Sequence, residues 1–285
     1  MTSTVETPSG KSAGDENFPV GSRLLPARLR PHVAAYYAFA RAADDIADNP
    51  ALAPEDKIAR LEAYGRALAE GEGDPVEFAK PHRLRESMAA TGVPARHGLD
   101  LLEAFKQDAV KTRYADWGEL IAYCTLSAAP VGRFLLDLHG ESRDGWPASD
   151  ALCSALQILN HLQDCQADYR ELDRVYLPLD WLTAQGGQVT DLYAKSAGGA
   201  LRAVIDSCLT GTEGLLQLAA ELPPRLRSRS LAMESAVILH LARRLTLLLR
   251  RGDPIAGRVK LSRLDFARCG LTGIIYGFFA AGRKA

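Results

Sequence analysis

The sequence predicts an all-α fold, in which the helices of one domain surround a central cavity. Apolar residues recur every three or four positions through most of the 285-residue chain, as they do on the buried face of a helix. The alternation of apolar and polar residues that marks a half-buried strand is scarce. Glycine and proline breakers separate the helical segments, and no break is long enough for a linker between domains.

The expected helices follow one another along the chain with short breaks between them. Residues 58–68 repeat apolar side chains at the three-four spacing of a helix face. Residues 231–249 are strongly apolar, which is typical of a largely buried helix. The other apolar segments are residues 33–40, 99–110, 151–159, 201–209 and 270–282. The breaks fall at residues 49–50, 71–75, 92–94, 145–147, 186–187 and 223–224.

Composition indicates an ordinary globular protein with a substantial core. Apolar residues make up 47% of the chain and charged residues 24%, and the formal net charge is −1, so we expect no nucleic-acid partner. Five cysteines lie singly, without a CxxC pair or a His-Cys cluster. This pattern favours buried thiols in a reducing compartment, so we expect a cytoplasmic protein.

The two ends of the chain carry different expectations. Residues 1–16 are polar and small and lack the apolar core of a signal peptide, which predicts a disordered tail ahead of one helical domain, residues 17–285. No segment is expected to supply the roughly 20 apolar residues that cross a bilayer. Residues 270–282 come nearest, and a core helix is the first interpretation. The alternative is an end that rests on the inner face of the cytoplasmic membrane.

Two aspartate pairs with identical spacing are the main chemical signal. Asp44 and Asp48 form one pair, and Asp164 and Asp168 form the other. The i,i+4 spacing places both carboxylates of a pair on one helix face. Adjacent carboxylates repel each other unless a cation neutralises them, and hard oxygen ligands suit Mg²⁺ shared with substrate phosphates. One such pair is most often a solvated helix face, but its repetition after two apolar segments favours metal binding.

The motifs around these aspartates resemble those of the head-to-head prenyl synthases, which include squalene, dehydrosqualene and phytoene synthases. Residues 41–48 (RAADDIAD) look like the first aspartate-rich motif of that family. Residues 160–168 (NHLQDCQAD), followed by RVYLP at 174–178, look like the second. Tyr123-Cys124 and Val131-Gly132 match the intervening segment. The resemblance runs from about residue 17 to the C-terminus, and it implies an isoprenoid-synthase type of helical bundle.

Departures from the general pattern point to one branch of the family. The chain reads LSAAP at 126–130, where many members have Val-Ala-Gly, and Gln163 stands where arginine is common. Residues 16–22 (ENFPVGS) replace the usual Ser-x-Ser-Phe. These variants resemble the bacterial hydroxysqualene synthases of hopanoid pathways, which convert presqualene diphosphate and water to hydroxysqualene. A synthase that condenses farnesyl diphosphate to presqualene diphosphate, squalene or dehydrosqualene is the alternative, and a non-catalytic assembly factor is a remote one.

The resemblance also implies roles for individual residues. The four paired aspartates would hold several Mg²⁺ ions against the diphosphate of a prenyl substrate, and Tyr123 would line the reaction centre. Ser127 is a candidate to place the water that captures a carbocation. The candidate substrate-binding residues are Arg41, Asn160, Arg174, Tyr176, Phe18 and Tyr37.

Several of these assignments have structural alternatives. Arg41 could instead bridge its own aspartates, Asn160 could serve helix packing, and the aromatic residues could be plain core. The polar block from Asp108 to Tyr114 is expected to be solvated, although the resemblance places it near the cavity. NADPH is not expected, because this branch ends in water capture. The sequence leaves the oligomeric state open.

Overall fold

The computed structural model describes residues 24–284 and is 72% helical, which confirms the predicted all-α class. The α-helices are α1 (Arg30–Ala47), α2 (Pro54–Ala69), α3 (Ala79–Thr91), α4 (Arg96–Asp108), α5 (Trp117–Ser127), α6 (Ala129–Leu138), α7 (Trp146–Leu172), α8 (Leu179–Ala184), α9 (Gly199–Ala219), α10 (Leu222–Arg225), α11 (Arg229–Arg251) and α12 (Arg263–Ala280). Two 3₁₀ turns, η1 (Arg143–Gly145) and η2 (Val189–Tyr193), and two short strands, β1 (Arg113–Tyr114) and β2 (Val175–Pro178), complete the described part. The expected boundary between a tail and a domain at residues 16–17 lies outside it.

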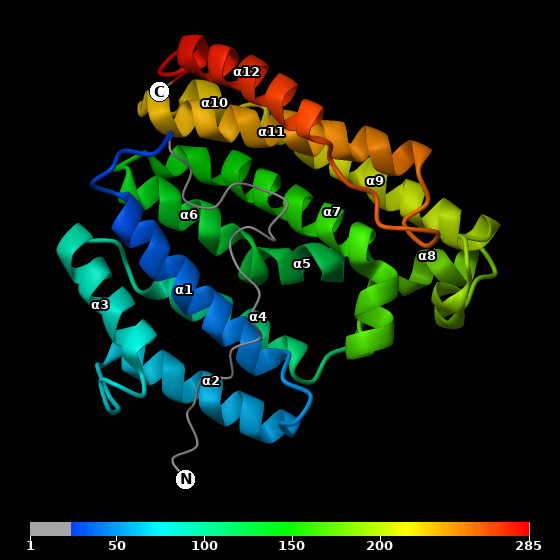
Figure 1. The fold of residues 1–285 in the computed structure, drawn as a ribbon, viewed down its shortest axis with the longest axis horizontal. Coiled ribbons are helices and arrows are strands. Elements are labelled where there is room, and N and C mark those ends of the chain that lie inside the picture. Colours follow the sequence, from blue (N-terminus) through cyan, green and yellow to red (C-terminus); the bar gives the residue numbers. More distant parts are fainter. Residues whose placement is uncertain (1–23, 285) are drawn as a thin grey trace.

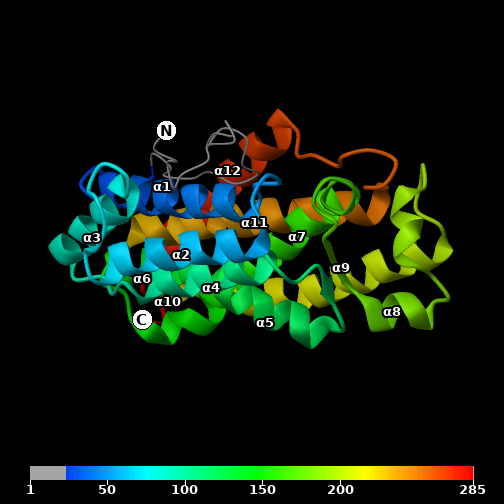
Figure 2. The ribbon, with the colours of Figure 1, turned by 90° about the horizontal axis from the view of Figure 1, so that it is seen from below.

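The helices form three groups around the long helix α7. Helices α1 to α4 pack together on one side, and α5 and α6 lie beside α7 in the middle (Figure 1). Helices α9, α11 and α12 cover the other side, with α12 outermost (Figure 1). In the perpendicular view, α3 and α8 again lie at opposite ends of the bundle (Figure 2). Helices α1 and α7 carry the two aspartate motifs.

The ends of α1 and α7 are fixed by local chemistry. Pro31 occupies the first turn of α1, where its missing N–H costs no hydrogen bond. Helix α7 ends at Leu172 and is capped by Asp173, which adopts the left-handed conformation with φ of 52°. The Arg113 guanidinium donates to the Asp173 carboxylate at 2.5 Å and holds this turn. The chain then reverses into β2, which pairs in parallel with β1. Because of this turn, the RVYLP segment folds back and packs against α7.

Helix α5 and helix α6 correct one expectation. Residues Trp117–Leu138 form a helical stretch of 22 residues that contains an 18-residue window of mean hydropathy 1.2, long and apolar enough by composition to cross a membrane. By length and composition, the expectation that no segment is apolar enough to cross a bilayer was therefore wrong. Half of the stretch is buried in the protein, and Tyr123, Cys124 and Phe134 belong to the core. Ala128, with φ of −126° and ψ of −46°, also breaks the stretch between the two helices. These features fit a pair of core helices.

Helix α12 is packed differently from the core helix expected at residues 270–282. Gly273 and Gly277 face α11 so closely that a Cβ atom would lie 2.5 Å from the Val237 Cα and 2.5 Å from the Ala232 carbonyl oxygen, respectively. Large side chains such as Leu271 instead point outward and are exposed. Only the glycine face of the helix is buried, because backbone-to-backbone approach leaves no room for a side chain.

This packing predicts opposite effects for two glycines of α12. Gly277→Ala should lower the free energy of unfolding by about 1–3 kcal/mol, because the added methyl group meets the α11 backbone. Gly270→Ala should raise it by about 0.5–1 kcal/mol, since a Cβ there meets nothing within 4 Å and alanine favours the helix. Urea unfolding of both variants measures the difference. Equal effects would contradict the close packing of α12 on α11.

Candidate active site

Both aspartate pairs line one pocket between α1 and α7. The pocket has a volume of about 270 Å³. Of the residues predicted for the site, it is lined by Asp44, Asp48, Tyr123, Ser127, Asn160, Asp164, Asp168, Arg174 and Tyr176. Its other lining residues, which the sequence analysis did not assign to the site, are Phe105, Asp108, Gln157, His161 and Leu172. Segments far apart in the chain thus converge on one acidic cavity.

Arginines neutralise three of the four aspartates. Arg41 Nη1 lies 2.8 Å from an Asp44 oxygen, and Arg41 also reaches Asp45 at 3.2 Å. Arg174 Nη1 lies 2.6 Å from Asp48 Oδ1. Arg258 Nε lies 2.9 Å from Asp164 Oδ1.

These ion pairs test the prediction for Arg41 and add one arginine that was not predicted. The self-bridging alternative for Arg41 is therefore present, and Arg41 does not line the pocket itself. Arg258 was not foreseen, because it meets Asp164 from a loop 94 residues away.

Arg174 is held in the pocket wall by more than its ion pair. Its side chain is 7% exposed, and a second guanidinium nitrogen donates to the Ala47 carbonyl oxygen at 3.3 Å. Burial alone would lower its pKa, but attraction to Tyr176, Asp108 and Asp48 outweighs burial and raises the pKa of the guanidinium. Arg174 is thus a fixed positive charge that links the end of α1 to β2.

The chemistry of the pocket fits Mg²⁺, although the ligands are not preassembled. Within residues 24–284, no three His, Cys, Asp or Glu side chains lie close enough together to hold a metal ion. The pocket nevertheless presents the carboxylates of two helices and the side-chain amide of Asn160 to one space. Oxygen donors of this kind suit a cation that keeps several waters and shares ligands with phosphates. Metal binding would compete with the arginine pairs.

Asp108 is not solvated, as its polar block suggested, but lines the pocket, as the resemblance implied. Its residue is 6% exposed, and it accepts hydrogen bonds from the Tyr123 hydroxyl at 2.7 Å and the Tyr176 hydroxyl at 2.9 Å. Burial raises the pKa of its carboxyl group, against the opposing effect of Arg174 and the two tyrosines. Burial and the nearby Asp108 also raise the pKa of the Tyr123 phenol well above its usual value. Both tyrosines therefore stay neutral, with their protons directed at Asp108.

Aromatic rings form the wall next to this carboxyl group. The His161 ring stacks on Tyr176, with centroids 3.6 Å apart and planes at 13°. Tyr114 and Tyr123 lie 5.4 and 5.5 Å from Tyr176, respectively, between ring centroids. Electron-rich faces of this kind stabilise a nearby cation. Tyr114 comes from β1 and Tyr176 from β2, so pairing of the two strands assembles the wall.

Ser127 stands out among the lining residues because its hydroxyl oxygen is buried and has no hydrogen-bond partner in the described part of the chain. Nearby in the lining, Gln157 Nε2 lies 3.0 Å from His161 Nε2. A buried polar atom without a partner is costly unless water or ligand satisfies it. The hydroxyl is therefore suited to hold a polar group inside the pocket.

An apolar cavity adjoins the acidic pocket along the same two helices. It has a volume of about 240 Å³ and is lined by residues of α1, α6, α7, α10 and α11. Tyr37 and Ala40 line it about two turns and one turn before Asp44, respectively, and Leu156 lines it directly before Gln157. The structure thus places Tyr37 in the apolar cavity, away from the aspartates. Phe18 lies outside the described residues.

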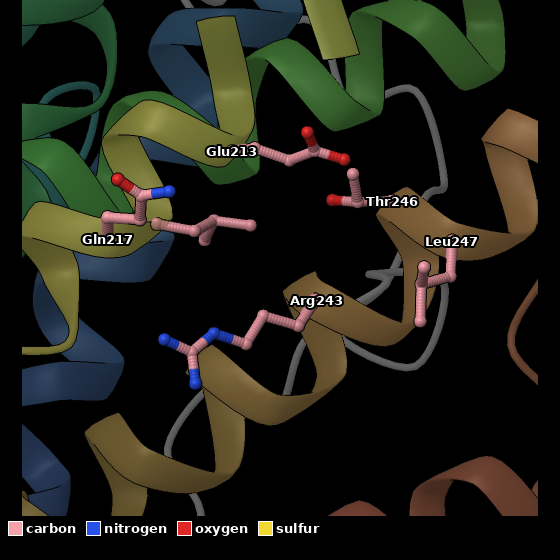
Figure 3. A pocket seen from close by; sticks show the side chains of 6 residues that line it. Glu213, Gln217, Arg243, Thr246 and Leu247 are labelled. Carbon is pink, nitrogen blue, oxygen red and sulfur yellow. The ribbon is translucent and has the colours of Figure 1, made fainter. Parts of the chain in front are cut away.

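A separate pocket between α9 and α11 lacks these features. Its volume is about 310 Å³, and Glu213, Gln217, Arg243 and Thr246 are among its lining residues (Figure 3). Glu213 is already bound by Arg250, whose guanidinium reaches both carboxylate oxygens at 2.9 Å. The pocket has no paired carboxylates and no apolar extension comparable to the cavity beside α1.

Comparison with known proteins fits this geometry. The family profile described as squalene/phytoene synthase matches residues 11–265 of the chain. The chain belongs to the squalene/phytoene synthase family. It is 45% identical to a hydroxysqualene synthase of Rhodopseudomonas palustris, over 93% of this chain and 90% of the relative. It is 43% identical to a hydroxysqualene synthase of Zymomonas mobilis, over 90% and 86%.

A solved member of the family shares the architecture. The crystal structure of a squalene synthase from Alicyclobacillus acidocaldarius superimposes on this chain with a TM-score of 0.73 at 31% identity. The match covers 84% of this chain and 90% of the crystallised chain. The predicted family and its isoprenoid-synthase type of helical fold are therefore confirmed. As a member of the squalene/phytoene synthase family, the chain is an enzyme that acts on a prenyl diphosphate.

Proposed function

We propose that this member of the squalene/phytoene synthase family converts presqualene diphosphate and water to hydroxysqualene and diphosphate. The observation that carries the proposal is the Ser127 hydroxyl, which lines the pocket of the four aspartates and whose buried oxygen has no hydrogen-bond partner among residues 24–284. The names of the two bacterial relatives support the same branch.

Binding would use the two adjoining cavities for the two halves of an amphiphilic substrate. The diphosphate would lie in the acidic pocket, where Asp44, Asp48, Asp164 and Asp168, with Asn160, would hold Mg²⁺. When bound, Mg²⁺ would supply charge that neutralises the departing diphosphate. Arg174, together with Arg41 and Arg258 beside the aspartates, would add fixed positive charge once metal competes for their carboxylates. The hydrocarbon chains would enter the apolar cavity lined by Tyr37.

The reaction begins when the bond between carbon and the diphosphate oxygen breaks and the diphosphate leaves with the electron pair. The carbocation that remains would rearrange beside the rings of Tyr123, Tyr176 and His161, whose faces stabilise positive charge. A water oxygen held by Ser127 would then form the new carbon–oxygen bond. Its surplus proton would pass to the Tyr123 oxygen while Tyr123 gives its own proton to Asp108. No nicotinamide takes part in this sequence.

Product analysis in labelled water tests the proposal. The purified protein with Mg²⁺ and presqualene diphosphate, and without nicotinamide, should release hydroxysqualene that carries ¹⁸O from H₂¹⁸O. Ser127→Ala should lower the share of hydroxylated product, because the buried water loses its holder. If presqualene diphosphate returns unchanged while farnesyl diphosphate is consumed, the enzyme is a condensing synthase and the proposal is wrong.

A further inference from the structure

Helix α12 carries an exposed apolar surface that the reaction does not use. Within residues 24–284, fourteen large hydrophobic side chains are exposed, and eight of them lie on this one helix. They are Leu264, Phe266, Leu271, Ile274, Ile275, Tyr276, Phe278 and Phe279. Exposed apolar residues are normal when scattered, but a contiguous group marks an interaction surface. We call this group the α12 face.

The α12 face is fixed outward by the packing on its other side. Gly273 and Gly277 touch the backbone of α11, so no larger side chain can turn inward there. The N-terminal turn is held by a capping box between Ser262 and Asp265, and Arg244 of α11 donates to the same aspartate at 2.6 Å. Rotation of the helix would break these contacts. Leu271, Ile275 and Phe278 therefore remain on the outer side of the molecule, where α12 lies in Figure 1.

The charges around the α12 face are mostly positive. Arg263 and Arg268 are exposed on the helix, and Arg283 and Lys284 are exposed just beyond it. The exposed Arg229 of α11 lies over the Phe278 ring at 5.0 Å. The only acidic residue of the helix, Asp265, is buried against Arg244. Lys284 lies near enough to Glu221 to lower the pKa of that carboxyl group, and the other charges named at the edge of the apolar face are positive.

We propose that the α12 face docks the enzyme on the surface of an anionic lipid bilayer. The helix would lie in the plane of the interface, with its Leu, Ile and Phe side chains among the lipid chains and its cations at the headgroups. A second copy of the chain fits less well, because pairing of two such faces would bring the arginines of both copies together.

The position of α11 links this surface to the substrate cavity. Ile238 of α11 lines the apolar cavity, while the neighbouring Val237 contacts Gly273 of α12. The docked surface and the apolar cavity thus lie on two sides of one helix. The docking proposal concerns a surface outside the acidic pocket, so it does not depend on which reaction that pocket performs.

Vesicle flotation of the full chain tests the proposal. Vesicles of equal parts phosphatidylcholine and phosphatidylglycerol should bind the protein, and binding should weaken as salt rises or when phosphatidylglycerol is left out. Leu271→Gln/Ile275→Gln should bind about a hundredfold more weakly, because two large apolar side chains no longer enter the lipid. The matched control Leu218→Gln/Leu247→Gln changes two leucines that are exposed elsewhere, and it should bind within about twofold of the unchanged protein.

Further variants and measurements keep the outcome decisive. Arg263→Gln/Arg268→Gln leaves the apolar residues in place and should lower binding to anionic vesicles by about tenfold or more. Circular dichroism checks that each variant is folded. Absence of flotation for the unchanged protein, or equal flotation of the Leu271→Gln/Ile275→Gln variant, would overturn the proposal. The proposal would also be overturned if the unchanged protein failed to bind vesicles but formed a dimer in light scattering, and if the Leu271→Gln/Ile275→Gln variant were a monomer.

Discussion

Asp164→Ala is expected to lower kcat by about a thousandfold or more in the presence of Mg²⁺ while the helical fold persists. Asp164 lines the acidic pocket from α7, and its charge is presently matched by Arg258 at 2.9 Å. Its removal would take away a ligand for the cation and leave an arginine free to bind the diphosphate in an unproductive position. Steady-state turnover across a range of Mg²⁺ concentrations measures kcat, and circular dichroism measures the helical content.

The same helix offers a matched control. Asp150 is also ion-paired, with Arg133 Nη2 at 2.6 Å, but it does not line the pocket. Asp150→Ala therefore removes from α7 an aspartate that is also paired with an arginine, and it should leave kcat within about threefold. Asp44→Ala should behave like Asp164→Ala. Retention of turnover in either pocket variant would remove the aspartates from the proposed metal site.

The parts of the site that depend on spacing within one helix could be predicted from the sequence. An i,i+4 pair places two carboxylates on one helix face, whatever the tertiary fold. When two such pairs lie at the ends of apolar helices, their carboxylates must face either a common cavity or solvent. Asp44 and Asp48 on α1 and Asp164 and Asp168 on α7 accordingly line one pocket. The order of motifs also sufficed to predict the family, and the spacing of apolar residues sufficed to predict the all-α class.

Contacts between distant segments could not be predicted in this way. Asp108 meets Tyr176 across 68 residues only because β1 and β2 pair after α7 has turned at Asp173. A polar residue at the end of a helix carries no signal of that pairing, so the residues alone predicted a solvated block, and only the family resemblance placed it near the cavity. His161 was also missed, although it follows Asn160 directly. Its role in the pocket wall depends on stacking against a ring from β2.

The interpretation of α12 shows a limit of hydropathy. Residues 270–282 are apolar enough for a core helix, and apolar content was the signal used. The spacing of Gly273 and Gly277 decides which face is buried, because only glycine allows the backbones of α11 and α12 to approach so closely. The larger side chains are consequently left outside. Glycines one turn apart in an apolar segment could have indicated this arrangement.

Tyr123→Phe is expected to lower kcat by about a hundredfold and to divert product formation after the diphosphate has left. The phenol is the nearest hydroxyl to Asp108, at 2.7 Å, and it would relay the proton released when water bonds to the carbocation. Tyr176→Phe is the comparison variant, since Tyr176 donates to the same carboxylate at 2.9 Å. If both hydroxyl groups merely satisfied the buried carboxylate, the two variants would lose activity equally. A larger loss for Tyr123→Phe, with altered products by mass spectrometry, indicates a role in proton transfer.

Asp108→Asn completes the test, because it keeps the shape of the side chain and removes its charge. If Tyr123 and Asp108 act as one relay, the variant that carries both substitutions should lose no more activity than the worse single variant, since the effects of members of one catalytic unit are not additive.

Burial raises the pKa of Asp108, and the relay needs the ionised carboxylate. Activity should therefore fall as pH drops through a value above the usual range for aspartate, and this acid limb should vanish in Asp108→Asn. An unchanged acid limb would place the essential group elsewhere, because Asp108 is the carboxylate to which the Tyr123 proton is directed.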